Sequence, residues 1–226
     1  MIFPIGDDQV KGGHFPLISY TFIALNVLVF VFQSSMPMGQ FQSFVTEYGS
    51  IPAETIRGED LFTLITSMFL HGSWMHLLGN MLFLWIFADN IEATIGSRRF
   101  LGFYLLGGLA AHAAHIYFNW GSPVPTVGAS GAISAVMGGY LVMFPTSRIK
   151  MLVLVFFTRI PAWVFLGFWI WQQWTFGNQA LQGDSAGVAW WAHIGGFVFG
   201  VVAGFYYRAR FSHPAKAPAY ARDELL

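Results

Sequence analysis

Residues that can carry out acyl-transfer chemistry stand at the beginnings of three apolar segments. One segment opens with His71, His76 and Asn80, another with Ser130, and a third with His193. A serine hydroxyl becomes a strong nucleophile when a base takes its proton, and histidine is the most common base. An asparagine amide, an imidazole N–H and the serine backbone N–H can stabilise the resulting oxyanion. Together these residue types predict hydrolysis of an acyl bond.

Each of these motifs taken alone has an ordinary structural explanation. His76 and Asn80 are four residues apart and share one helix face, as a buried polar pair that ties helices together would. No Glu follows His76 in the arrangement of a zinc protease, which needs two histidines four residues apart with a Glu beside the first. Gly128 and Gly131 flank Ser130, but small residues are also common where membrane helices pack.

A stripe of small residues predicts which segments meet. His193 is followed by Gly196 and Gly200 on nearly the same helix face. The segment that begins with Ser130 offers Gly131 and further small residues in return. Two smooth faces allow close approach of the backbones, so we expect Ser130 and His193 to touch across this contact.

The composition identifies the kind of protein that must position these residues. Of the 226 residues, 55% are hydrophobic and 10% are charged, and the mean hydropathy is +0.56. Soluble domains carry about 25% charged residues, so the chain is expected to be a multi-spanning membrane protein. Eleven Lys and Arg against eleven Asp and Glu leave no basic excess for nucleic acid. The chain has no Cys, which excludes disulfides and thiolate chemistry.

Six apolar runs divide the chain and predict an all-α polytopic bundle of six transmembrane helices. They cover residues 17–32, 74–91, 100–118, about 127–144, 161–176 and 188–207. We expect one membrane domain at 17–207 with an outer loop at about 36–70. A cytoplasmic tail is expected at 1–16, without the features of a cleaved signal peptide, and a second one at 208–226.

The placement of basic residues predicts the orientation. With the N-terminus in the cytoplasm, ten of the eleven Lys and Arg residues fall on inner segments, and only Arg57 falls outside. Both termini are therefore expected in the cytoplasm. Asn80, Ser130 and His193 then lie at similar depth near the outer face, because each is followed by about 18–21 Å of helix before its span ends. Independent structural groups would not be expected to coincide in this way.

The same depth argument predicts a dyad rather than a triad. Asp89 and Glu92 lie near the inner end of their span, and Asp184 falls in an outer loop, so no carboxylate reaches the level of His193. Two further histidines, His112 and His115, are three residues apart. They are expected to pack or hydrogen-bond, and a haem or metal site made from them with His71 and His76 is the less favoured alternative.

These motifs resemble the rhomboid family of intramembrane serine proteases. The matching residues are His71-x₄-His76-x₃-Asn80, Gly128-Ala129-Ser130-Gly131 and His193-x₂-Gly196-x₃-Gly200. The resemblance covers about 17–207 and implies that Ser130 is the nucleophile and that His193 is the general base and acid. It also implies that His76, Asn80 and the Ser130 backbone bind the oxyanion, and that His71 has a supporting hydrogen-bonding role.

The resemblance also implies partners and location. It implies transmembrane protein substrates, no metal or cofactor, and a prokaryotic inner membrane with the active site opening toward the outer face; it implies no oligomeric state. A non-proteolytic, client-binding relative of the same fold is the main alternative. Two departures stand out: some members carry a Tyr at the position of Ser134, stacked on the catalytic His, and some carry a Trp-Arg pair in the loop that corresponds to 36–60.

Overall fold

A computed structural model describes residues 2–8, 15–182 and 187–211 of the chain. Its helices and strands are, in chain order, β1 (Ile2–Gly6), α1 (Leu17–Ser34), α2 (Met38–Tyr48), α3 (Pro52–Thr55), α4 (Thr63–Thr66), a 3₁₀ turn (Ser67–Phe69), α5 (Trp74–Ile95), α6 (Ser97–Phe118), α7 (Ser130–Met143), β2 (Arg148–Val153), β3 (Phe156–Pro161), α8 (Ala162–Leu181) and α9 (Trp190–Phe211). The chain is therefore mainly helical.

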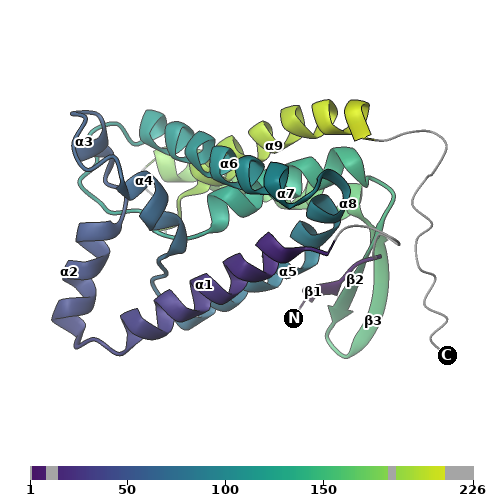
Figure 1. Cartoon of the computed structure of the whole chain (residues 1–226), viewed down its shortest axis with the longest axis horizontal. Helices are drawn as coiled ribbons and strands as arrows, with labels where there is room; N and C mark the ends of the chain where they lie inside the picture. The colour runs from purple at the N-terminus through teal and green to yellow at the C-terminus, as the bar shows by residue number, and fades with distance from the viewer. Residues whose placement is uncertain (1, 9–14, 183–186, 212–226) are drawn as a thin grey trace.

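The long helices run along the longest dimension of the molecule (Figure 1). α2 and α3 lie at one end of this bundle, which we call the α2 end, and the sheet of β1, β2 and β3 lies at the other, the sheet end. α5, α7 and α9 start near the α2 end, so the residues that open these helices gather there. α7 is the central helix, because it packs against α5, α6 and α9 and most of its side chains are buried.

The contact between α7 and α9 is close because glycines form it. A Cβ placed on Gly196 would collide with the carbonyl oxygen of Gly131, and one on Gly200 would collide with the carbonyl oxygen of Ala135. No larger residue fits either position without moving the backbones apart. The small-residue stripes expected to meet are therefore in contact, and they hold the first turn of α7 beside the first turn of α9.

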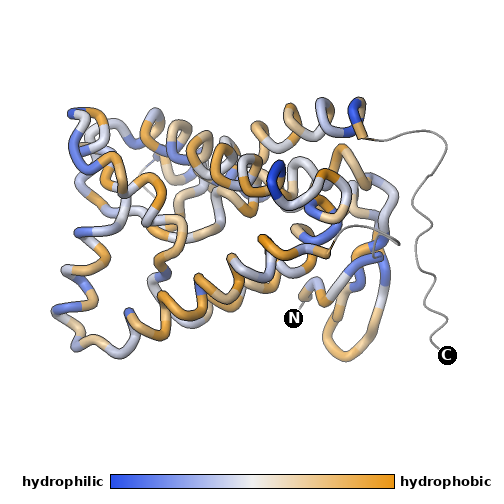
Figure 2. The backbone as a smooth tube through the Cα atoms, in the orientation of Figure 1, coloured by the Kyte–Doolittle hydropathy of each residue, from blue (hydrophilic) through white to orange (hydrophobic). Residues whose placement is uncertain are grey.

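The six spans stay a prediction. Among the described helices, α1 and α6 are long and apolar enough to cross a membrane by length and composition alone, and α7 is apolar but has only 14 residues. α5, α8 and α9 have 20 to 22 residues. Figure 2 shows that much of the backbone on the outside of the bundle is hydrophobic.

The expectation of an all-α protein is wrong in one region. β1, β2 and β3 form an antiparallel sheet in that order, with Val153 paired to Phe156 across the β2–β3 turn. The sequence predicted a short cytoplasmic tail at residues 1–16 and an inner segment that contains Arg148, Lys150 and Arg159. Neither segment is long, and the partner strands are about 145 residues apart in the chain, so local patterning gives no sign of their pairing.

Two predicted boundaries also change. α8 continues to Leu181, so part of the expected outer loop after Gly177 is helical. α9 continues to Phe211, beyond the predicted end of the sixth apolar run at 207, and residues 212–226 lie outside the described part of the chain.

Candidate active site

A cavity of about 780 Å³ lies at the α2 end of the bundle. The first turns of α5, α7 and α9 line it together with the second half of α6 and parts of α8. Its lining includes Ser130, His193, His76 and Asn80. The cavity is large enough for several water molecules and for a short extended piece of peptide.

Ser130 and His193 form a hydrogen-bonded pair on the wall of this cavity. The Ser130 Oγ lies 2.8 Å from His193 Nε2, although the two residues are 63 positions apart. Ser130 is the first residue of α7, and His193 is in the first turn of α9. The close packing of these two helices at their glycines therefore sets the distance between the serine hydroxyl and the imidazole.

The turn that precedes Ser130 requires a glycine. Gly128 has φ = +126°, a backbone conformation that L residues rarely adopt. A Cβ at Gly128 would lie 2.7 Å from His76 Nε2 and 3.6 Å from Asn80 Nδ2. The backbone N–H of Gly128 donates to the carbonyl of Ser67 at 2.8 Å. This turn is thus fixed from one side and faces two side-chain donors on the other.

Asn80 and the two nearby histidines form a connected group on α5 and the segment before it. Asn80 Nδ2 donates to His71 Nε2 at 2.9 Å, and His71 is fully buried. The backbone N–H of His71 donates to the side chain of Gln33 at 3.1 Å, which attaches α1 to the group. The His76 ring lies half-buried at 5.1 Å from the His71 ring, centroid to centroid. His71 therefore orients Asn80, whose second N–H is not used in this hydrogen bond.

Gln173 is a member of the site that the sequence analysis missed. Its Oε1 lies 2.7 Å from His193 Nδ1, and its side chain is buried. The Trp169 ring lies 6.0 Å from the His193 ring, and the Trp190 ring lies 6.1 Å away. The only sequence signal is a Gln pair, Gln172-Gln173, within an aromatic-rich run. Helical spacing alone did not show that Gln173 would reach across to α9.

Ser134 occupies the position where some relatives carry a tyrosine, and it does not contact His193. Its hydroxyl donates to the carbonyl of Ser130 at 2.6 Å, one turn back along α7. The aromatic surroundings of His193 come from α8 and from the start of α9 instead, through Trp169 and Trp190.

His112 and His115 are engaged with other side chains around the cavity. His112 Nε2 lies 3.1 Å from the Ser67 hydroxyl, and His115 Nε2 lies 2.8 Å from the Thr126 hydroxyl. Asn119 Nδ2 lies 3.3 Å from His115 Nδ1. Within the described residues no group of three His, Cys, Asp or Glu side chains is arranged to hold a metal ion. The hydrogen bonds place these histidines in the walls of the cavity.

No carboxylate lines the cavity among the residues that the structure describes. Asp89 and Glu92 are near the end of α5 at the sheet end. Asp184 lies outside the described residues. The dyad is thus surrounded by neutral hydrogen-bonding groups and aromatic rings.

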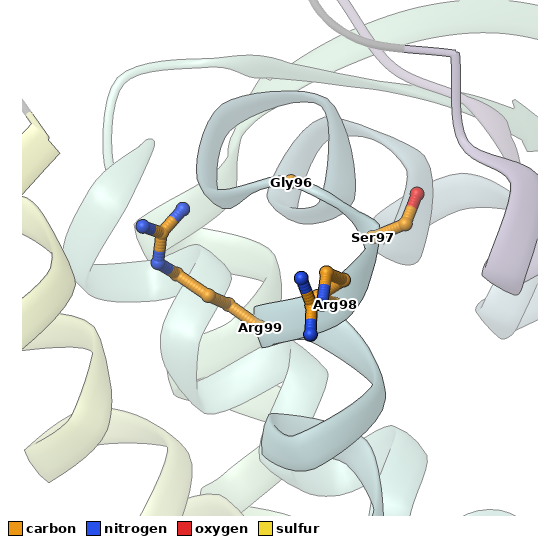
Figure 3. Close-up of a pocket in the computed structure, with 4 residues that line it drawn as sticks. All are labelled: Gly96, Ser97, Arg98 and Arg99. Atoms are coloured by element: carbon orange, nitrogen blue, oxygen red, sulfur yellow. The ribbon is translucent and has the colours of Figure 1, made fainter.

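A second cavity, of about 540 Å³, lies at the sheet end and is lined by residues 96–99. Figure 3 shows Ser97 and Arg99 pointing to different sides of this helix start. Arg99 Nη1 donates to the carbonyl of Ile95, and its guanidinium lies 4.8 Å from the Phe211 ring centre. This second cavity contains no base beside a nucleophile, so the chemistry belongs to the first one.

Known proteins are similar to this chain over most of its length. A family model described as Rhomboid domain matches residues 58–210. The Rhomboid protease GluP of Bacillus subtilis is 30% identical over 207 residues, which are 92% of this chain and 37% of that protein. Rhomboid protein 1, mitochondrial, of Saccharomyces cerevisiae is 27% identical over 191 residues, or 83% of this chain and 52% of that protein.

A human relative is similar to the same degree. The Presenilin-associated rhomboid-like protein, mitochondrial, of Homo sapiens is 30% identical over 192 residues, or 79% of this chain and 45% of that protein. The chain thus spans about half, or less, of the length of these three relatives.

Proposed function

The chain belongs to the rhomboid family, and we propose that it is an intramembrane serine endopeptidase that cleaves membrane-protein substrates. The observation that carries the proposal is the 2.8 Å contact between Ser130 Oγ and His193 Nε2 on the wall of a cavity of about 780 Å³. The protease among its relatives supports the reaction class.

In the proposed mechanism, His193 Nε2 takes the hydroxyl proton as Ser130 Oγ bonds to the substrate carbonyl carbon. The proton then passes to the leaving amine as the C–N bond breaks, and the acyl group stays on Ser130. A water molecule in the cavity, deprotonated by His193, attacks the acyl carbon. The ester bond to Ser130 Oγ then breaks, His193 returns the proton to that oxygen, and the second product leaves as a carboxylic acid. Both steps pass through an oxyanion at the former carbonyl oxygen.

We assign the oxyanion-binding role to Asn80, His76 and the backbone N–H of Ser130. Asn80 and His76 face the Gly128 turn just before the nucleophile. A first-turn N–H of a helix has no partner within that helix and carries the positive end of the helix dipole, so the N–H of Ser130 suits an anion. His71 supports this arrangement through its hydrogen bond to Asn80.

We propose that the chain spans the membrane six times with the sheet end in the cytoplasm and both termini inside. The distribution of Lys and Arg supports this orientation. This orientation puts the cavity near the outer face of the membrane. Water can then enter from the outer aqueous phase, and a substrate segment can enter laterally from the bilayer. The domain limits remain those predicted from sequence: a membrane domain at 17–207 between two cytoplasmic tails. Relatives come from both a bacterium and mitochondria, and a prokaryotic inner membrane remains our prediction for this chain.

The test is cleavage of a single-span reporter by the purified protein in liposomes, together with labelling by a fluorophosphonate probe. We expect cleavage and labelling in the wild type, neither in Ser130→Ala, and no loss in Ser43→Ala, a matched change on exposed α2. Reporter capture without cleavage or labelling would favour the client-binding alternative. Cleavage that survives in Ser130→Ala would overturn the proposed nucleophile.

A further inference from the structure

Gln173 determines which nitrogen of His193 carries the proton. The Gln173 Nε2 donates to the carbonyl of Trp169 at 3.3 Å, one turn back along α8. The amide oxygen therefore faces His193 Nδ1, at 2.7 Å. A carboxamide oxygen only accepts hydrogen bonds, so Nδ1 must be the protonated nitrogen. His193 Nε2 then presents its lone pair to the Ser130 hydroxyl, which lies 2.8 Å away.

We propose that Gln173 is the positioning residue that holds the catalytic base in its working tautomer and ring orientation. This inference rests on the proposed function and deepens it, because it supplies the third member of a Ser–His–Gln relay in place of a carboxylate. Gln173 acts only through His193 and does not touch the substrate.

The surroundings of His193 leave this task to Gln173. The other titratable side chains that line the cavity are His76 on α5 together with His112 and His115 on α6. Among the described residues, the side chains that hydrogen-bond to His193 are Ser130 and Gln173. The Trp169 and Trp190 rings contact the imidazole through their faces and edges, so they restrict its tilt without choosing its tautomer.

A neutral acceptor has a different effect from the usual carboxylate. A carboxylate fixes the tautomer and also stabilises the imidazolium formed during attack, whereas an amide fixes the tautomer only. Replacing Gln173 by Glu should keep the acceptor and add that stabilisation. The acidic limb of the pH profile should then move to higher pH, because the protonated form of the base is favoured.

The experiment compares Gln173→Met, Gln173→Glu and the control Gln172→Met by reporter cleavage and by the rate of fluorophosphonate labelling. Met has a similar volume to Gln but no acceptor oxygen, and Gln172 is the neighbouring residue on α8. We expect Gln173→Met to lower kcat about 10- to 100-fold with KM nearly unchanged. Gln173→Glu should retain most of the activity with a shifted acidic limb, and Gln172→Met should behave as wild type.

The outcomes separate this inference from the proposed function. If the wild type is neither labelled nor active, the proposed function fails. If the wild type is active and Gln173→Met keeps the wild-type kcat and pH profile, the positioning role is overturned. The activity of Gln173→Met could instead fall in parallel with its thermal stability, while Gln173→Glu shows no shift of the acidic limb. A packing role predicts both results, so this outcome would also overturn the positioning role.

A second and independent inference concerns the hairpin of β2 and β3, which projects sideways from the bundle at the sheet end (Figure 1). Its turn is strongly apolar (Figure 2). Four consecutive residues at and beside the turn, Leu154, Val155, Phe156 and Phe157, are between 67% and 77% exposed. Contiguous exposed apolar side chains on a projecting element indicate a partner surface.

The turn sequence is unusual for a hairpin in water. Val153 pairs with Phe156, so Leu154 and Val155 form a two-residue turn, and Leu154 has φ = +57°. A two-residue turn with positive φ at its first position normally carries Gly there, because a bulky residue is strained at positive φ. Leucine at this position fits a tip that lies in an apolar medium.

The base of the hairpin is basic where its tip is apolar. Lys150 lies directly opposite Arg159, and Arg148 begins the same strand. Arg148 and Arg159 are both exposed, so an anionic surface beside the hairpin can reach their guanidinium groups.

We infer that this hairpin docks on the anionic inner surface of the lipid bilayer, with Leu154 to Phe157 in the acyl boundary and Arg148 and Arg159 at the phosphates. The inference depends on the proposed placement in the membrane and not on the proposed chemistry. Basic residues beside an apolar tip are the pattern of interfacial membrane anchors.

The chain has no Cys, so a single introduced Cys can carry an environment-sensitive fluorophore. Val155→Cys and Phe157→Cys are compared with Thr146→Cys, an exposed position at the same end, in phosphatidylcholine vesicles with and without phosphatidylglycerol. We expect the two hairpin labels to be quenched by lipid-borne quenchers, the control label by aqueous iodide, and the hairpin quenching to increase with phosphatidylglycerol. Arg159→Gln should remove that increase.

Hairpin labels that are open to iodide in both vesicle types would overturn the inference. Protection from iodide that depends on protein density, with fluorophore self-quenching, would also overturn it and would instead indicate contact with a second copy of this chain.

Discussion

The two ends of the bundle contain polar clusters built on different rules. At the sheet end, the Glu92 carboxylate accepts hydrogen bonds from the backbone N–H groups of Ile18 and Ser19 and from the hydroxyls of Ser19 and Ser97, at 2.5 to 2.8 Å. At the α2 end, the Ser130 hydroxyl is hydrogen-bonded to His193, and Ser130 also lines the large cavity.

A second group at the sheet end follows the same rule as Glu92. Asn90 donates to the Asp7 carboxylate at 2.5 Å, and the Tyr140 hydroxyl is hydrogen-bonded to both Asp7 and Ser147. These bonds attach β1 to α5 and α7. The saturated clusters thus join the start of α1, the sheet, the end of α5 and the start of α6.

We call a polar cluster saturated when every acceptor in it is matched by donors. The comparison teaches that saturation distinguishes the clusters that hold the fold together from the site proposed to react. Charged and polar groups inside a membrane protein are expensive and are functional candidates by default. Where every acceptor is matched by donors, the group joins elements. Where a nucleophile keeps one open side beside a cavity, it can react. The predictions below test this distinction, from the largest expected effect to the smallest.

Removing the base should separate activity from stability most clearly. We expect His193→Ala to lower kcat/KM by roughly 10⁴-fold or more, because a serine without its base is a weak nucleophile. The thermal unfolding midpoint should change little, since the ring faces a cavity. Reporter cleavage and unfolding are measured on the same preparation. An active His193→Ala variant would show that another group is the base.

Glu92 should show the opposite behaviour. We expect Glu92→Ala to lower the free energy of unfolding by about 3 kcal/mol or more, because the buried N–H and hydroxyl donors around it lose their acceptor. The fraction that still folds should cleave the reporter at a near wild-type rate. Denaturant unfolding in detergent and activity per folded molecule provide the two measurements. An activity loss larger than the loss of folded protein would place Glu92 in the chemistry and break the comparison.

Asn80 should show a mixture of both effects, since it belongs to the site and also binds buried His71. We expect Asn80→Ala to lower kcat about 100-fold, which is the typical effect of losing one oxyanion donor. The free energy of unfolding should fall by about 1 kcal/mol from the lost hydrogen bond to His71. Kinetics at saturating substrate and denaturant unfolding check the two parts. An unchanged kcat would remove Asn80 from the oxyanion site and leave it a purely structural role.

The contact between Ser130 and His193 could be predicted from the sequence because its signals are local. Gly128, Ser130 and Gly131 are adjacent, and the glycines after His193 repeat at helical spacing. Small residues on two helices imply close backbones, and the structure has Ser130 and His193 in contact. The family comparisons then agreed with the resemblance inferred from these motifs.

The parts that sequence reasoning missed depend on contacts between distant segments. Gln173 reaches His193 from another helix, and β1 pairs with a strand about 145 residues later. Glu92 and Asp89 lie near the end of their helix, as the sequence predicted, but no pattern showed that Glu92 would accept from the first turn of α1. Such pairings are set by how the helices pack, which hydrophobic periodicity does not encode.

His115 tests the comparison most directly. It lines the same cavity as Ser130 and His193, yet both of its ring nitrogens are hydrogen-bonded to neighbouring side chains. Asn119 donates to its Nδ1, so Nε2 carries the proton and donates to the Thr126 hydroxyl at 2.8 Å. His193 also has partners at both ring nitrogens, but its Nε2 accepts from the Ser130 hydroxyl, whereas His115 Nε2 donates and so cannot take a proton from Thr126. We therefore expect a structural role for His115. Thr126→Val should therefore lower the free energy of unfolding by about 1 kcal/mol and reduce kcat less than about threefold, against the exposed control Thr46→Val. If kcat instead fell about 100-fold with stability unchanged, His115 would take part in the reaction, and saturation would not be enough to tell a structural histidine from a reacting one.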